Sequence, residues 1–319
     1  MAPNAEIAVI IAAYNASETI LRAIHSALAQ TAKVEVIVVD DCSQDDTVAV
    51  AKSVEDPRLT VISQSRNMGA GSTRNHGIEA GKAPWLAVLD SDDFMAPDRL
   101  ELLLAEATAC GADFLADDIY RVTNSDLNST RNPLWQVNGT TPERITFEKF
   151  VDGNRRNRHG NRGELGFVKP LMNRSFMERN GLRYAEGMRL AEDYLLYAEA
   201  LAAGCNFQLV GPKGYFAMHR DDSLSSNHTT ADLGAIVAVD RALLTHPGLS
   251  ERDKAALRRH LTDVRKEWAW RRTIDAVKAR DLADIASLAI EPPAVSLSVM
   301  GKLLEQVWLR GRRRLTGET

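Results

Sequence analysis

The sequence predicts an α/β protein with a doubly wound, mainly parallel sheet flanked by helices, followed by a C-terminal helical extension. In the first third of the 319 residues, short apolar runs alternate with segments of helical periodicity. Strand–helix–strand alternation with connections of this length is typical of parallel sheets that are covered by helices. From about residue 231 onward, apolar residues recur at helical spacing.

Continuous apolar runs predict strands that are buried on both faces. In the first third of the chain these runs cover residues 7–13, 34–39, 59–62 and 85–89. Apolar spacings of three and four predict the intervening helices, over residues 17–28, 45–54, 72–80 and 97–109. Ser17 and Asp45 are the expected N-caps of the first two helices, and Pro97 is the expected start of the fourth.

The middle of the chain, residues 113–219, follows a less regular pattern. Residues 123–163 predict a long loop with one short helix near residues 147–151, and loops of this length are commonly functional. Helical periodicity returns at residues 191–203, so a further helix is expected before the C-terminal helical extension.

Composition and charge argue against several classes of protein. The chain has 39 Lys and Arg against 43 Asp and Glu, a formal net charge of −4, which argues against a general nucleic-acid binder. The longest apolar run, residues 7–14, is far shorter than the roughly 18 residues of a membrane-spanning helix, and its flanks are not those of a signal peptide. Cys42, Cys110 and Cys205 are far apart, which argues against a disulfide framework or zinc site and favours a cytoplasmic protein.

An acidic segment, Asp90-Ser91-Asp92-Asp93, follows the fourth predicted strand. Ligands of parallel sheets bind beyond the carboxyl ends of the strands. Clustered carboxylates suit a hard divalent ion, and Mg²⁺ typically takes one or two carboxylates together with substrate phosphates. The segment therefore predicts a metal–diphosphate site. The alternative is a solvated turn in which one of these acids caps the helix at Pro97.

Other polar residues follow the first two predicted strands, namely Tyr14 with Asn15 and Asp40 with Asp41. A carboxylate at such a strand end can accept hydrogen bonds from a nucleobase or a ribose hydroxyl. The alternative is an Asp- and Ser-rich turn that leads into the next helix.

A glycine-rich segment, residues 67–75 (NMGAGSTRN), leads into the third predicted helix. Backbone N–H groups and the helix dipole favour phosphate at such a position. Arg74 could reach a phosphate or orient the Asp92 carboxylate. Glycines that serve turn geometry alone are an equally good interpretation.

Glu192 and Asp193 lie within an otherwise apolar helical segment. Because adjacent residues point in different directions on a helix, one is expected to face a cleft and the other a basic or backbone partner. A carboxylate in a cleft could act as a general base, whereas acids at a helix start would be favoured by the dipole alone. His219, after a strand-like segment, could ligate a metal or contact a diphosphate, or it could be structural.

Taken together and in this order, these segments resemble the inverting glycosyltransferases of family 2, which have the GT-A fold. The matching stretches are residues 9–15 (VIIAAYN), 36–43 (VIVVDDCS), 67–69 with 74–75, 90–93, 192–193 and the pattern Tyr215, His219, Ser223. The resemblance covers about residues 6–225. It implies a nucleotide-sugar-binding half at residues 1–110, an acceptor-binding and catalytic-base half at 111–225, and a helical region at 226–319.

The resemblance also implies a donor site. Its nucleotide-binding residues would be Ala12, Tyr14, Asp40, Asp41, Asn67, Gly69, Arg74, Asp90, Ser91 and Asp92. Asp90 and Asp92 form the DxD motif of the family, and Mn²⁺ or Mg²⁺ is expected at Asp92, Asp93 and His219. The sequence departs from the family at Ala12, where Pro is common, and His219 matches a variable position.

The family reaction is a single displacement at the anomeric carbon of a nucleotide sugar. Asp193 would be the catalytic base, and Glu192 would support the acceptor. The segment from residues 166–172 through Tyr184, with residues 192–194, looks like bacterial exopolysaccharide glycosyltransferases, including those of succinoglycan type. This implies a lipid-linked oligosaccharide acceptor and a UDP-sugar such as UDP-glucose. The alternatives are a catalytically silent nucleotide-sugar or glycan-binding protein on the same fold and another nucleotide enzyme.

The C-terminal segment combines an apolar helical stripe with clustered arginines. The stripe consists of Val295, Val299, Met300, Leu303, Leu304, Val307 and Trp308, and the arginines are Arg310, Arg312, Arg313 and Arg314. Such a helix suits the surface of an anionic bilayer, in keeping with a location on the cytoplasmic face of the inner membrane. The alternative is a helix that packs on the rest of the protein.

Overall fold

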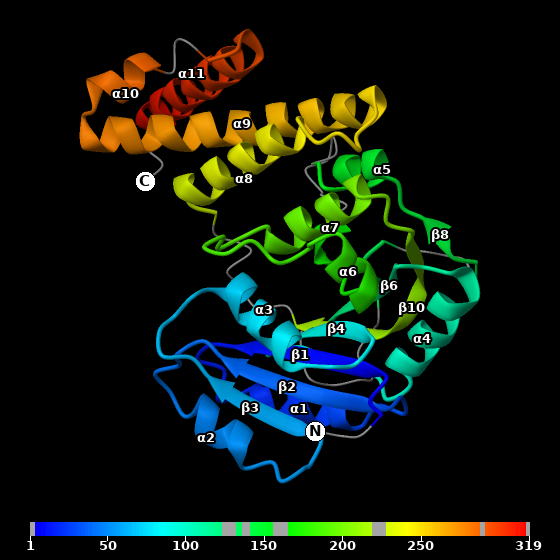
Figure 1. The fold of residues 1–319 in the computed structure, drawn as a ribbon. Helices are drawn as coiled ribbons and strands as arrows, with labels where there is room; N and C mark the ends of the chain where they lie inside the picture. Colours follow the sequence, from blue (N-terminus) through cyan, green and yellow to red (C-terminus); the bar gives the residue numbers. More distant parts are fainter. Residues whose placement is uncertain are drawn as a thin grey trace. The chain divides into compact units, whose positions relative to one another are not determined.

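The computed structural model describes residues 4–122, 132–135, 141–155, 165–218, 228–287 and 291–316. The chain divides into two compact units, Met1–Ser226 and Asn227–Thr319 (Figure 1). The first unit is built on one mixed sheet, and the described part of the second is helical.

The amino-terminal half of the sheet is parallel, as the sequence predicts. Its strands are β1 (Ile7–Ala13), β2 (Val34–Asp40), β3 (Leu59–Ser63) and β4 (Trp85–Asp90), in the order β3-β2-β1-β4. Ile7 of β1 lies opposite Val34 of β2 and Trp85 of β4, so the carboxyl ends of these strands share one edge. The side chains of β1 and β2 are almost wholly buried, which accounts for their unbroken apolar runs.

The same sheet continues into residues beyond 110. The order after β4 is β9 (Leu171–Asn173), β6 (Phe114–Val122), β10 (Phe207–Met218) and β5 (Phe94–Met95). β9 is antiparallel to β4 and β6, whereas β10 is parallel to β6. The short strands β7 (Asn132–Pro133) and β8 (Glu143–Arg144) pair with β6 and β10. Strands from residues 1–110 and 111–225 thus form a single sheet.

Helices cover both faces of this sheet. They are α1 (Ile20–Leu28), α2 (Thr47–Lys52), α3 (Ala70–Ala80) and α4 (Arg99–Cys110). α1 and α4 share a core with Ile7, Val9 and Ile11, whereas α3 packs on the face of Ile10 (Figure 1). A Cβ on Gly77 of α3 would lie 2.4 Å from Ile10 Cγ2, so glycine permits this close approach.

The predicted starts of the first, second and fourth helices are wrong. α1 begins at Ile20 with Thr19 at its N-cap position, and the Ser17 N–H donates instead to the Asp45 carboxylate of the neighbouring loop (3.1 Å). α2 begins at Thr47 with Asp46, not Asp45, at its N-cap position, although the Asp45 carboxylate accepts the Thr47 N–H (3.0 Å). α4 begins at Arg99 with Asp98 at its N-cap position, and the Pro97 carbonyl accepts the Thr31 N–H (2.8 Å).

The remaining helices of the first unit pack through aromatic side chains. They are α5 (Phe147–Gly153), the 3₁₀ helix η1 (Leu165–Phe167), α6 (Arg174–Arg179) and α7 (Glu192–Ala202). Tyr197 of α7 makes edge-on contacts with Phe114 of β6 and Phe207 of β10, and Tyr194 stacks on Phe150 of α5. These rings fix α7 on the sheet.

The second unit contains α8 (Thr230–Leu243), α9 (Glu251–Ala279), α10 (Leu282–Ser287) and α11 (Pro293–Thr316). Capping boxes begin α8 at Thr229 and α9 at Ser250. Val295 and Val299 of α11 are buried against Ala269 of α9. Within the described residues, every helix is too short or too polar to cross a membrane.

Candidate active site

The loops that follow β1 and β2 are bound to each other. The Asn15 N–H donates to Ser43 Oγ (2.9 Å), and Asn15 Oδ1 accepts the Gln44 N–H (2.8 Å). Asn15 adopts a left-handed conformation (φ 48°), which its short polar side chain tolerates. The contacts hold the end of β1, with the half-exposed Tyr14, beside the end of β2. Ala12 lies two residues before Tyr14 and is partly accessible.

Asp40 and Asp41 are both buried, and each carboxylate holds a neighbouring loop. Asp40 accepts the Ser43 N–H (3.0 Å) and also bonds the Ser43 hydroxyl. Asp41 accepts the N–H groups of Met68 (2.7 Å) and Gly69 (2.9 Å). The carboxylate of Asp41 thereby takes up two backbone donors of the glycine-rich segment that the sequence assigned to the phosphates. Asn67 lies just before this turn.

The glycine-rich start of α3 packs closely on a distant segment. Asn75 exchanges two hydrogen bonds with the backbone of Tyr184 (2.8 and 2.9 Å). A Cβ on Gly71 would lie 2.8 Å from the Ala185 carbonyl oxygen, so only glycine fits at that position without displacing backbone. These contacts favour the packing interpretation of the glycines and bring Arg74, on the same helix, toward the start of α7.

Arg74 is the centre of a buried ion cluster, defined here as Arg74, Asp90, Lys169, Glu192 and Asp193. Arg74 Nη2 lies 2.9 Å from Asp90 Oδ1, and Arg74 Nη1 lies 2.6 Å from Glu192 Oε1 and 3.5 Å from Asp193 Oδ1. Lys169 Nζ lies 2.8 Å from Asp193 Oδ2 and 3.1 Å from Asp90 Oδ2. The cluster thus joins α3, β4, α7 and the segment before β9.

The charges of the cluster stabilise one another against burial. Burial alone would lower the pKa of Arg74, but Asp193, Asp90 and Glu192 raise it well above its usual value. Burial would likewise lower the pKa of Lys169, which Asp193 and Asp90 raise. Burial would raise the pKa of Asp90, but Lys169 and Arg74 hold it below its usual range. Arg74, Lys169 and Asp90 are therefore charged at neutral pH.

Glu192 and Asp193 occupy the first turn of α7, which confirms the helix-start alternative for these two acids. Ala191 before them adopts a left-handed conformation (φ 67°), which starts the helix at Glu192. Carboxylates in a first turn are favoured by the helix dipole. Both acids bond Arg74, so the expectation that they face different partners is wrong for this cation.

The acidic segment after β4 divides into groups with different environments. Asp93 is buried; its carboxylate accepts the Tyr215 hydroxyl (2.8 Å) and the Met218 N–H (2.8 Å). Burial, with the charges of Asp90 and Asp92, raises the pKa of Asp93 well above its usual value. These contacts tie β4 to β10 and take Asp93 away from the expected role of metal ligand. Ser91 and Asp92 remain partly accessible.

Among the described residues, Asp92 supplies an accessible carboxylate for a metal at this edge. Arg22 of α1 donates to the Asp92 carbonyl, which fixes the backbone beside that carboxylate. Within the described residues there is no group of three or more metal-ligating side chains. One accessible carboxylate fits Mg²⁺ or Mn²⁺ when a substrate diphosphate supplies further oxygens. His219, the other predicted ligand, lies outside the described residues.

Sequence patterns did not reveal several side chains of the site. Lys169 was part of a matching stretch but was assigned no role; its signal is a lysine within an apolar segment. Tyr184 places its ring 5.3 Å from the Arg74 guanidinium, a cation–π contact. Tyr215, which donates to Asp93, also accepts the Asp90 N–H (3.3 Å).

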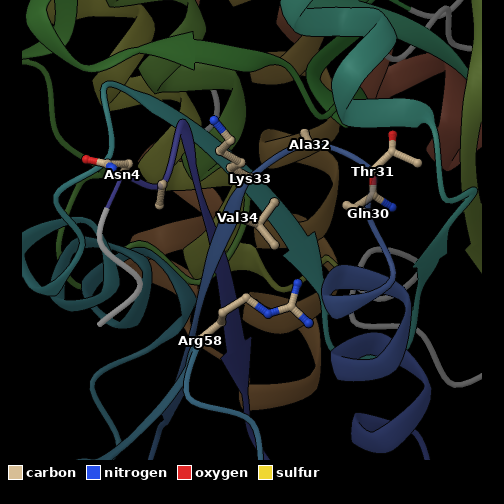
Figure 2. Close-up of a pocket in the computed structure, with 8 residues that line it drawn as sticks. Asn4, Gln30, Thr31, Ala32, Lys33, Val34 and Arg58 are labelled. Atoms are coloured by element: carbon tan, nitrogen blue, oxygen red, sulfur yellow. The ribbon is translucent and has the colours of Figure 1, made fainter.

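A surface cavity of about 290 Å³ lies at the opposite edge of the sheet. Figure 2 shows its lining side chains, which come from residues that begin or precede the parallel strands. Of its two basic lining residues, Lys33 and Arg58, the second is paired with Asp56 (2.8 Å). The carboxylates lie at the other strand ends, so this cavity is separate from the candidate site.

Comparison with known proteins identifies the family. The sequence model described as "Glycosyl transferase family 2" matches residues 8–171. The chain belongs to glycosyltransferase family 2. It is 39% identical over 301 residues to the succinoglycan biosynthesis protein ExoU of Rhizobium meliloti (strain 1021), covering 94% of this chain and 87% of that protein. ExoO of the same strain is 36% identical over 291 residues, covering 90% and 82%.

Two further comparisons concern the donor and the fold of this family 2 chain. An Escherichia coli protein, WfaP, described as a UDP-Glc:α-D-GlcNAc-diphosphoundecaprenol β-1,3-glucosyltransferase, is 38% identical over 95 residues, or 30% of this chain and 38% of WfaP. The structure of S. aureus TarS (residues 1–349) with UDP-GlcNAc superposes with a TM-score of 0.67 at 17% identity, covering 93% of this chain and 92% of TarS. This likeness confirms the GT-A fold.

We expect the Asp41→Asn substitution to lower the free energy of unfolding by about 1–3 kcal/mol, because an amide can accept only one of the two buried N–H groups of Met68 and Gly69. Asp46→Asn, at an exposed acid in the same loop, is the matched control and should change it by less than about 0.5 kcal/mol. Urea unfolding of both variants measures the difference. Equal effects would show that Asp41 does not hold the glycine-rich turn.

Proposed function

We propose that this family 2 glycosyltransferase is an inverting, metal-dependent hexosyltransferase. It takes a sugar from a UDP-hexose such as UDP-glucose and adds it to a lipid-linked saccharide during the synthesis of a bacterial exopolysaccharide or other surface polysaccharide. The observation that carries the proposal is the position of Asp193. Asp193 lies in the first turn of α7. It shares both Arg74 and Lys169 with Asp90 at the end of β4, so a candidate base lies beside a carboxylate of the candidate donor site.

The donor would lie along the carboxyl ends of β1, β2 and β4. Ala12 and Tyr14 are accessible there. The loops that follow β1 and β2 are hydrogen-bonded to each other and offer a rigid surface for the nucleobase. Uridine is supported by the descriptions of WfaP and of the TarS complex. A saccharide product of the exopolysaccharide class is supported by the names of ExoU and ExoO, and a lipid diphosphate acceptor by that of WfaP.

The proposed metal is Mn²⁺ or Mg²⁺ at Asp92. When bound with the donor, such an ion neutralises charge that develops on the departing diphosphate. Asp92 supplies a carboxylate whose backbone is fixed by Arg22, and Ser91 lies beside it. Asp93 instead holds this segment on β10 through Tyr215 and Met218.

The proposed reaction is one in-line displacement. A bond forms between the acceptor oxygen and the anomeric carbon while the bond from that carbon to the diphosphate oxygen breaks. Asp193 takes the proton of the acceptor hydroxyl. Glu192, held by Arg74 at 2.6 Å, would orient the acceptor beside it. A single attack inverts the anomeric centre, so an α-linked donor gives a β-glycoside.

We expect Asp193→Asn to lower sugar transfer by about 10²–10⁴-fold, the usual effect of removing a positioned base, and to leave UDP affinity nearly unchanged. Transfer is measured as UDP release with a panel of nucleotide sugars and a lipid-linked saccharide, and affinity by calorimetry. Glu199→Gln, a half-buried acid two turns along α7, is the matched control. Near-normal transfer by Asp193→Asn would assign the role of base to Glu192. UDP binding without transfer in the wild type would favour a catalytically silent binding protein.

We expect Asp92→Ala to abolish the gain in UDP affinity that Mn²⁺ or Mg²⁺ produces in the wild type, because it removes the accessible carboxylate after β4. UDP titrations with each ion and with a chelator measure the gain. Asp98→Ala, at an exposed acid just before α4, should retain it. Equal UDP affinity with and without divalent ions in the wild type would contradict the metal site.

The membrane contact is proposed for one face of α11. The predicted stripe splits in the structure: Val295 and Val299 are buried on α9, whereas Met300, Leu304 and Trp308 are each more than half exposed. Leu297, which is not part of the predicted stripe, is also more than half exposed. Four arginines follow within residues 310–314. An exposed apolar face next to clustered basic residues fits an anionic bilayer. The proposed location is the cytoplasmic face of the inner membrane, where a nucleotide sugar and a lipid-linked acceptor would meet.

We expect the double substitution Leu297→Ser, Leu304→Ser to weaken binding to vesicles that contain phosphatidylglycerol by about tenfold or more, since each leucine contributes about 1.5–3 kcal/mol on burial. Co-sedimentation of the full-length protein at low salt measures the binding, with pure phosphatidylcholine vesicles as the neutral reference. Leu102→Ser, at an exposed leucine of α4, is the control. If the wild-type protein does not bind anionic vesicles, the proposed lipid contact of the exposed face is wrong.

A further inference from the structure

Lys169 places its ammonium group between the two carboxylates at the centre of the site. Its Nζ lies 2.8 Å from Asp193 Oδ2 and 3.1 Å from Asp90 Oδ2. The other oxygen of each carboxylate faces Arg74: Asp90 Oδ1 at 2.9 Å and Asp193 Oδ1 at 3.5 Å. Each carboxylate is therefore held at both oxygens by two different cations, which restricts its rotation.

The backbone that carries Lys169 is held by buried groups. Arg99 Nη2 donates to the Lys169 carbonyl (2.7 Å), and the Tyr197 hydroxyl donates to the Val168 carbonyl (3.1 Å). Arg99 is itself paired with Asp117 (2.7 Å), and both side chains are fully buried. The ammonium thus projects from a fixed point, although Lys169 lies in a connection between η1 and β9 rather than in a helix or strand.

Lys169 is the cation closest to Asp193. Arg74 is more distant from Asp193 and also bonds Glu192 and Asp90, so the shortest contact between Asp193 and a cation is the one with Lys169.

We propose that Lys169 is a positioning residue for sugar transfer: it orients Asp193 and ties it to Asp90 at the donor site. The inference rests on the proposed function of Asp193. It adds a residue that acts through the base rather than on the substrate. It also explains why a lysine is buried at this point of the chain.

The test compares Lys169→Met and Lys169→Arg with the wild type in steady-state transfer. We expect Lys169→Met to lower kcat by about 10²-fold with a smaller change in the donor KM, because the base is misplaced while the donor groups remain. Lys169→Arg, which keeps a cation between the two carboxylates, should retain a kcat closer to that of the wild type.

A double-mutant cycle separates this role from a general effect on folding. In Lys169→Met, Asp193→Asn, transfer should be no lower than in Asp193→Asn alone, because Lys169 acts through that carboxylate. The double variant also removes the unbalanced carboxylate, so it remains informative if Lys169→Met fails to fold. Lys213→Met, at a half-buried lysine whose ammonium pairs with Glu106, is the matched control and should keep the wild-type kcat.

The outcomes distinguish this inference from the proposed function. Wild-type transfer that depends on Asp193, together with an unchanged kcat in Lys169→Met, would overturn the role of Lys169 alone. Additive losses in the double variant, or a loss of kcat in Lys169→Arg as large as in Lys169→Met, would also overturn it. Absence of transfer by the wild-type chain with every nucleotide sugar would overturn the proposed function and this inference together.

Discussion

The ion cluster of Arg74, Asp90, Lys169, Glu192 and Asp193 is the interaction on which the geometry of the site depends. Removing one member of a buried ion pair is strongly destabilising, commonly by about 3–5 kcal/mol, because it leaves a charge without a partner. Here each acid of the cluster forms an ion pair with at least one cation. Several segments must therefore meet at once, and α3, β4 and α7 are brought to one edge of the sheet by the same set of contacts.

The rigid surroundings of the cluster come from acidic side chains that bind backbone rather than ligand. Asp41 holds the turn before α3, and Asp93 holds β4 on β10. Several acidic side chains of the motifs thus stabilise the edge of the sheet. A smaller set of groups, with Tyr14, Ser91 and Asp92 among them, remains accessible there.

In the second unit, one helix fits both interpretations of its sequence, the packed helix and the exposed apolar surface. α11 buries Val295 and Val299 against α9, and it exposes Leu297, Met300 and Leu304. Residues 295 and 299 lie one turn apart on one side, while residues 297 and 304 are almost two turns apart on the opposite side. Packing and an exposed apolar surface are therefore compatible, because they use different faces of the same helix.

The sequence by itself determined the strands β1 to β4, the alternation of strands and helices along the first 110 residues and the membership of family 2. Those features depend on local apolar periodicity and on motifs within single segments, which a linear pattern contains. The tertiary structure decided the partners of the charged groups. Asp41 binds amides 27 and 28 residues later, Asp93 binds an amide 125 residues later, and Lys169 reaches Asp193 across 24 residues. A pattern of residue types shows that a carboxylate is present, but the packing of distant segments determines whether that carboxylate faces a backbone amide, a buried cation or open solvent.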